Sequence, residues 1–86
     1  MIKKEDDKKN ILVQIIQVLS EQLGAGASNI NGSSLLVDDL GMDSFGAVEL
    51  VFALNSKFGI EISQDDFREV KTVSSIVDYI ALKIKD

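Results

Sequence analysis

Three stretches of the chain place apolar residues three or four positions apart, the spacing of one face of an α-helix. The first ends at Gly24, the second runs from about Ser44 to Phe58, and the third begins near Thr72. The apolar positions of the first stretch are Leu12, Ile15, Ile16, Leu19 and Leu23. Those of the third are Val73, Ile76, Val77, Ile80 and Ile84. The pattern predicts three helices.

Residues at the ends of these stretches are typical helix caps. Asp43 precedes the second stretch and Gly59 follows it. A shorter helix is predicted after Ser63, because Ser-Gln-Asp-Asp resembles a capping box. Alternation with period two is confined to residues 59–63, so strands are not expected. The predicted fold is all-α, a small four-helix bundle of three longer helices and one short helix.

A long loop is expected between the first and second helices. Residues 24–43 lack a helical period and are rich in glycine, serine and asparagine. Loops of this length in small domains are often functional. Ile30, Leu36 and Leu40 are expected to fix the loop to the core. Because the chain has only 86 residues, we expect residues 1–86 to form a single domain.

The second helix carries apolar residues on two faces. With residues placed at ~100° per step, one stripe is expected to face the core; it contains Ala47, Leu50, Val51, Leu54 and Phe58. Phe45, Val48 and Phe52 fall outside this stripe, beside Ser44. Such a strip on a surface helix predicts a docking surface. The alternative is a central helix that packs on both sides.

The composition removes most enzyme chemistry. The chain has no cysteine and no histidine, which excludes disulfides, thiolate nucleophiles, imidazole bases and the usual zinc ligands. Ser44 therefore has no histidine, and no nearby lysine, to activate it as a nucleophile. Asp38, Asp39 and Asp43 do not match a calcium-binding EF-hand loop, because apolar residues occupy ligand positions. No catalytic residue and no metal site are predicted.

Charge is distributed unevenly along the chain. The net charge is −5, and residues 38–66 contain seven acidic residues against Lys57 alone. This region would repel nucleic acid and attract partners with basic patches. The apolar run 11–18 includes Gln14 and Gln17, so it is neither a signal peptide nor a membrane span. We expect a cytoplasmic monomer.

The run Asp-Leu-Gly-Met-Asp-Ser-Phe at residues 39–45 resembles the attachment motif of acyl carrier proteins, usually Asp-Leu-Gly-x-Asp-Ser-Leu. Further segments resemble that family in order and spacing. They are Val48-Glu49-Leu50-Val51, Ala53-Leu54, Phe58, Glu61-Ile62, Thr72-Val73 and Asp78-Tyr79-Ile80. The resemblance extends over the whole domain from the first helix onward.

This resemblance implies that 4′-phosphopantetheine from coenzyme A is attached to the Ser44 hydroxyl, with Asp43 as part of the motif. The thiol of the arm would hold acyl groups as thioesters, a chemistry that the side chains lack. The chain would be a non-catalytic carrier that meets a phosphopantetheinyl transferase and enzymes that load and transfer acyl groups. The resemblance places their docking at Met42, Phe45, Val48, Glu49 and Phe52.

Several positions depart from the family pattern. Phe45 replaces the usual leucine, and non-acidic residues stand where fatty-acid carriers are typically acidic: Gly46, Asn55, Ser56 and Lys57. We therefore expect a specialised carrier for lipid modification or a polyketide-like product, rather than the general carrier of fatty acid biosynthesis. Two alternatives stay open: a peptidyl or aminoacyl carrier, and a helical adaptor in which Ser44 is never modified.

Gly46 also lies inside the second helix, where glycine costs about 0.5–1 kcal/mol relative to alanine. Unless a close contact requires glycine there, Gly46→Ala is expected to stabilise the protein.

Overall fold

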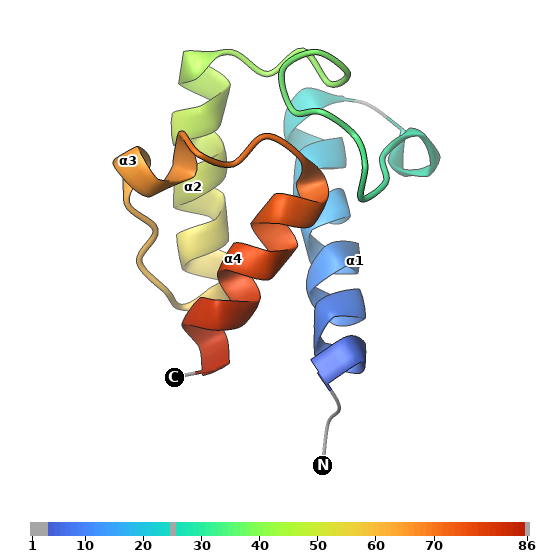
Figure 1. The fold of residues 1–86 in the computed structure, drawn as a ribbon. Helices are drawn as coiled ribbons and strands as arrows, with labels where there is room; N and C mark the ends of the chain where they lie inside the picture. The colour runs from blue at the N-terminus through green and yellow to red at the C-terminus, as the bar shows by residue number, and fades with distance from the viewer. Residues whose placement is uncertain (1–3, 25, 86) are drawn as a thin grey trace.

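The computed structural model describes residues 4–24 and 26–85. Over this range the helices are α1 (Lys4–Leu23), the 3-10 helix η1 (Ala27–Asn29), α2 (Ser44–Phe58), α3 (Gln64–Phe67) and α4 (Val73–Lys85). Figure 1 shows α1 antiparallel to α2, with the long loop crossing the end of the bundle where α1 finishes and α2 begins. The predicted bundle of three longer α-helices and one short one is confirmed, and η1 is an unpredicted element within the loop.

The apolar stripe of α1 is centred slightly away from the predicted positions. Ile11, Ile15 and Leu19 are buried, at 4% exposure or less, because their spacing of four keeps them on the face toward the other helices. The predicted residues Leu12 and Ile16 flank this stripe and are half-buried. The predicted helix is therefore correct, and its buried face includes one residue that the pattern missed.

The predicted stripe of α4 is buried except at its last member. Four of its five positions are core residues: Val73, Ile76, Val77 and Ile80. Ile84 is 47% exposed. It lies in the last turn of α4. Ile84 thus continues the helical spacing of the stripe without being a core residue.

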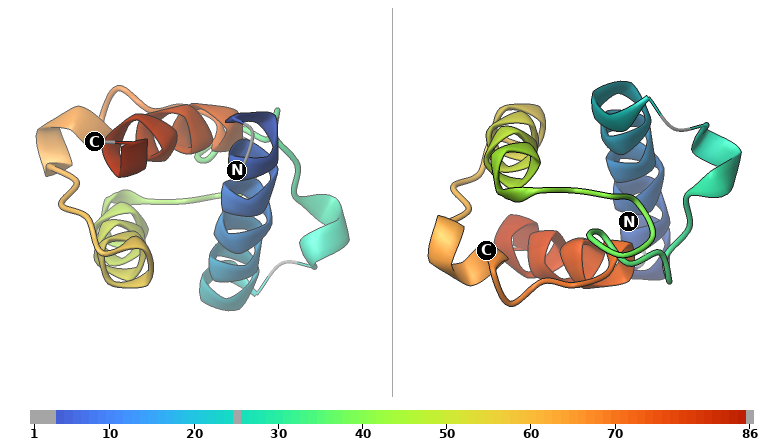
Figure 2. Two further views of the ribbon diagram at one scale, coloured as in Figure 1. Left: turned by 90° about the horizontal axis from the view of Figure 1, so that it is seen from below. Right: turned by 90° about the horizontal axis from the view of Figure 1, so that it is seen from above.

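The long loop is fixed to the bundle by side chains and by backbone pairing. Ile30 and Leu36 are buried and Leu40 is half-buried, as predicted. The loop also pairs with the segment before α4: Leu36 N donates to Lys71 O at 3.0 Å, and Val73 N donates to Ser34 O at 3.1 Å. Figure 2, seen from above, shows the loop lying across the ends of the helices. Its position beside α4 is therefore set by hydrogen bonds between residues far apart in the sequence.

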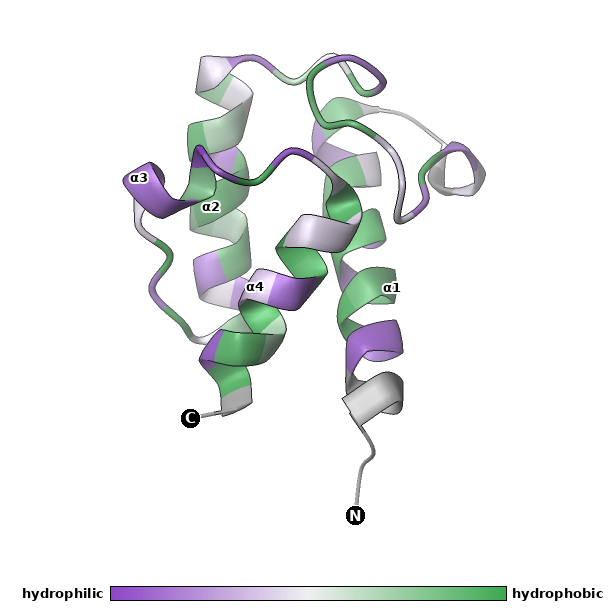
Figure 3. Ribbon diagram, viewed as in Figure 1, coloured by the Kyte–Doolittle hydropathy of each residue, from purple (hydrophilic) through white to green (hydrophobic). Residues whose placement is uncertain are grey.

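Helix α3 is short and polar, yet it is held at three points. Ser63 Oγ accepts a hydrogen bond from Asp66 N at 3.0 Å, which confirms the predicted cap. Phe67 is buried, although Figure 3 shows hydrophilic residues over most of α3. Tyr79 Oη of α4 donates to Asp66 Oδ2 at 3.0 Å. Burial raises the pKa of Tyr79, and the hydrogen bond and charge of Asp66 raise it further.

Candidate site at the start of helix α2

Ser44 is the first residue of α2, and its position is defined by the residue before it. Asp43 has an extended backbone, and its Oδ1 accepts a hydrogen bond from Gly46 N at 2.7 Å. This is the geometry of a helix N-cap, as predicted. Ser44 is exposed. A serine at the start of a helix usually caps it, but here Asp43 is the cap. The Ser44 side chain is therefore not needed for that role.

The turn before Ser44 explains the Asp-Leu-Gly part of the motif. Asp39 Oδ2 accepts a hydrogen bond from Leu35 N at 2.8 Å, so Asp39 closes this turn rather than serving only as solvated charge. Gly41 has φ +69, a conformation that side chains disfavour, and its N–H donates to Val37 O at 2.9 Å. The turn therefore requires an acceptor at position 39 and glycine at position 41, and it delivers the chain to the start of α2.

Met42 does not belong to the exposed surface. Its side chain is only 6% exposed, whereas the resemblance placed it among the docking residues. It directly precedes the N-cap and joins the hydrophobic core instead. This expectation is corrected: the side chain of Met42 packs in the core below the start of α2 and is not part of the exposed surface of that helix.

Gly46 lies in a tight place between α1 and the start of α2. Gln22 Nε2 of α1 donates to Gly46 O at 2.7 Å. A Cβ at position 46 would lie 3.2 Å from both Asp43 Oδ1 and Met42 Cγ. A side chain here would therefore press against the capping carboxylate and against Met42, and one of them would have to shift by a few tenths of an ångström. Gln22 is a site residue that the sequence pattern gave no reason to select.

The outer face of α2 carries an exposed apolar strip. Phe45 is 72% exposed, Phe52 is 70% exposed and Val48 is 38% exposed. Glu49, beside them, is also exposed. On the opposite face, the predicted core stripe is buried or half-buried. The alternative in which α2 packs on both sides is therefore wrong. We call Phe45, Val48 and Phe52 the apolar strip.

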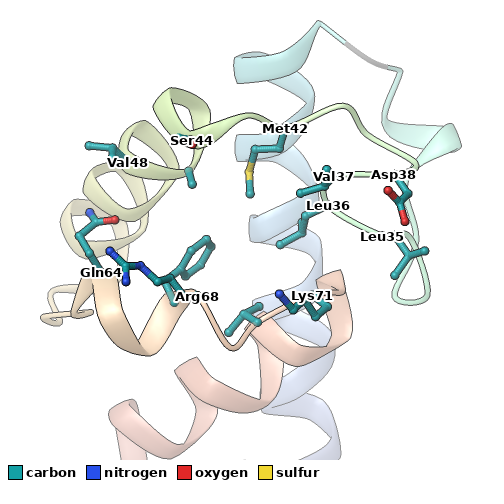
Figure 4. Close-up of a pocket in the computed structure, with 13 residues that line it drawn as sticks. Leu35, Leu36, Val37, Asp38, Met42, Ser44, Val48, Gln64, Arg68 and Lys71 are labelled. Atoms are coloured by element: carbon teal, nitrogen blue, oxygen red, sulfur yellow. The ribbon is translucent and has the colours of Figure 1, made fainter.

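A hollow of about 500 Å³ opens between α2, α3 and the long loop, with Ser44 among its lining residues (Figure 4). Its apolar lining includes the buried side chains of Leu36, Met42 and Phe67. Two cationic side chains, Arg68 and Lys71, lie on the wall across from Ser44. The site therefore places the exposed Ser44 hydroxyl beside an apolar hollow whose far wall carries two positive charges.

Asn55 is a second residue whose role the sequence did not reveal. Its Oδ1 accepts a hydrogen bond from Ile62 N at 2.8 Å, and its backbone O accepts from Gly59 N and Ile60 N. Asn55 thus ties the end of α2 to the segment leading to α3. In the sequence, Asn55 stands four residues before Gly59, the residue that ends α2. Its hydrogen-bond partner Ile62 can be located only in the folded chain.

The comparisons with known proteins agree with this geometry. The profile of the family described as "Phosphopantetheine attachment site" matches residues 13–80. An acyl carrier protein of Chlamydia caviae is 41% identical over 76 residues, which cover 88% of this chain and 90% of the relative. The chain belongs to the acyl carrier protein family. It therefore has a phosphopantetheine attachment site, and it is a non-catalytic carrier.

A solved acyl carrier protein has a similar structure. The protein comes from Enterococcus faecalis and was described for its high thermal stability. It superposes on this chain with a TM-score of 0.74 at 30% identity, covering 88% of this chain and 96% of that one. The fold of this chain is thus that of acyl carrier proteins. Family membership favours the acyl carrier over the peptidyl carrier and the helical adaptor.

Two negative findings concern the described residues. Among residues 4–24 and 26–85, no helix is long and apolar enough to cross a membrane. Within the same ranges, no group of three or more acidic side chains is placed to hold a metal ion.

Proposed function

We propose that Ser44 carries the phosphopantetheine arm. The observation that carries this proposal is the position of Ser44. It is the exposed first residue of α2, and its hydroxyl does not serve as the helix cap because Asp43 does. Ser44 lies at the N-terminal end of α2, where the helix dipole stabilises negative charge, so it favours an anionic group attached to the Ser44 hydroxyl. The motif around Ser44 and the family profile, which includes this position, support the same residue.

The residues at the site fit such a group. The Ser44 hydroxyl opens to solvent and to the hollow, so a long chain attached there has an apolar space beside it. Once attached, the arm supplies a terminal thiol that holds acyl groups as thioesters. The protein's residues position this chemistry: Asp43 fixes the start of the helix, and the turn through Gly41 presents it at the end of the bundle.

We further propose that partner enzymes dock on the apolar strip together with Glu49. As a member of its family the chain meets a phosphopantetheinyl transferase and acyl-transferring enzymes. Exposed aromatic side chains on a small protein are typical anchors of transient interfaces. The acidic residues around α2 favour partners whose contact surfaces are basic. Because coenzyme A is the donor of the arm, we place the protein in the cytoplasm.

We also propose a specialised pathway rather than general fatty acid biosynthesis. The support is the reduced negative charge along α2, where Gly46, Asn55, Ser56 and Lys57 stand. At two of these positions the structure gives a local reason for the residue: Gly46 fits a tight contact, and Asn55 bonds to Ile62. The pathway proposal therefore depends most on Ser56 and Lys57, which are exposed.

The experiment for Ser44 is intact-mass analysis after incubation with coenzyme A and a phosphopantetheinyl transferase. The wild-type protein should gain the mass of one arm, and Ser44→Ala should gain none. Ser33→Ala is a matched control, because Ser33 is an exposed serine of the long loop outside the motif. Arm attachment to Ser44→Ala would overturn the assignment.

A further inference from the structure

The hollow beside Ser44 brings together charges that are far apart in the sequence. No basic residue occurs between Lys9 and Lys57, so the long loop and the first turns of α2 supply only acidic side chains. The fold then places Arg68 and Lys71 at the hollow from the other side (Figure 4). These two side chains are the positive charges among the residues that line it, and Asp38 is the negative one.

Both cations are available to an incoming anion. Arg68 lies 3.7 Å from Asp65, but both side chains are largely exposed, at 78% and 87%, so this pair is weak. Lys71 is exposed and takes part in no ion pair with the described residues. An additional anion at the hollow would therefore meet two cations that have no strong competing partner.

The backbone of Lys71 is hydrogen-bonded to the loop that leads to Ser44. Its backbone carbonyl accepts a hydrogen bond from Leu36 N at 3.0 Å, and the adjacent Thr72 forms an antiparallel bridge with Leu35. The same loop continues through the turn at Gly41 to the start of α2. The backbone of Lys71 and the attachment point are thus parts of one hydrogen-bonded unit, which lowers the entropy lost when a ligand bridges them.

We propose that Arg68 and Lys71 bind the phosphodiester that joins the arm to Ser44, and that they direct the arm across the hollow toward α3. This inference rests on the proposed attachment at Ser44. The phosphodiester is the one permanent anion that the arm brings, and it would otherwise lie beside the carboxylate of Asp43, the residue before Ser44, which repels it. Charge-assisted hydrogen bonds from guanidinium and ammonium groups to phosphate oxygens offset this repulsion.

The test compares nuclear magnetic resonance spectra of the apo protein and of the protein with the arm but no acyl group. In the wild type, attachment should shift the amide signals of residues 68–71 and the side-chain signals of Lys71, as well as signals near Ser44. In the double variant Arg68→Gln/Lys71→Gln the shifts at residues 68–71 should fall at least two-fold. Lys57→Gln is the matched control, since Lys57 is an exposed lysine at the other end of α2, and it should leave these shifts unchanged.

The outcomes separate this proposal from the attachment itself. Intact mass shows whether the arm is present, so an unmodified protein counts against Ser44 attachment and not against the cation pair alone. If the arm is attached but residues 68–71 do not shift, or if the double variant keeps the wild-type shifts, the proposal is wrong. If those residues shift only after a dicarboxylic acyl group is loaded, the cations bind the cargo carboxylate instead, and the phosphodiester assignment is overturned.

Discussion

Replacing Phe52 with alanine tests whether the apolar strip serves partners or stability. Phe52 is 70% exposed, so truncation removes roughly a third of the burial of a phenylalanine, about 60 Å². At about 25 cal/mol per Å² this loss is about 1.5 kcal/mol. Alanine recovers about 0.5 kcal/mol through its higher helix propensity. The free energy of unfolding should therefore fall by about 1 kcal/mol or less.

The same variant should impair contact with partners. Chemical denaturation gives the free energy of unfolding, and the rate of arm transfer from coenzyme A, measured at limiting carrier concentration, reports the contact. Phe52→Ala should slow this transfer, because a few central apolar anchors dominate transient interfaces. Val13→Ala is the matched control: Val13 is an apolar residue of α1 that is 55% exposed, and its loss should leave the rate unchanged.

A buried reference calibrates the comparison. Leu54 is fully buried on the opposite face of α2, so Leu54→Ala should cost about 2–5 kcal/mol. A cost of about 3 kcal/mol or more for Phe52→Ala would show that Phe52 is a core residue. Unchanged stability together with an unchanged transfer rate would refute the docking role.

Three further variants test separate parts of the account. Glu49→Lys should lower the association rate with a transferase and weaken its salt dependence, because it reverses an exposed steering charge; stopped-flow binding at several salt concentrations measures both. Gly46→Ala should lower the free energy of unfolding by up to about 1 kcal/mol, since its Cβ would displace the capping carboxylate of Asp43; a clear gain in stability would contradict the tight contact. Burial and Asp66 raise the pKa of Tyr79 above 10.0 in the folded state, so its stabilising contribution is full below that pH and is lost as the pH rises through the folded pKa. Denaturation of Tyr79→Phe between roughly pH 9 and 11 should show a shallower loss of stability than the wild type, and parallel curves would count against the shift.

The helices could be predicted because their signals are local. Apolar spacing and caps such as Asp43 and Ser63 involve residues within one or two turns of each other, and the structure places the caps as expected. The exposure of Phe52 also followed from its angular position on the helix, whereas Phe45 was expected to be partly buried and is 72% exposed. Periodicity reports which face a residue occupies, but it does not report how far along the helix that face is covered, so the exposure of Ile84 could not be predicted from its spacing.

The parts that were missed depend on contacts between distant segments. Gln22 meets Gly46 across 24 residues, and the Lys71 carbonyl meets Leu36. Neither contact leaves a periodic pattern in the sequence. Met42 was misplaced because the resemblance assigns roles by position in a motif, whereas the direction of a side chain before a helix depends on the turn that precedes it. The hollow is a product of the same long-range packing.

The most direct test of the central claim is to locate the arm on the chain by tandem mass spectrometry. The protein is incubated with coenzyme A and a phosphopantetheinyl transferase, digested, and the peptide containing residues 28–57 is fragmented. The account predicts that fragments containing Ser44 carry the arm, whereas fragments containing only Ser28, Ser33 and Ser34, or only Ser56, do not. An arm found on any serine other than Ser44 would contradict it.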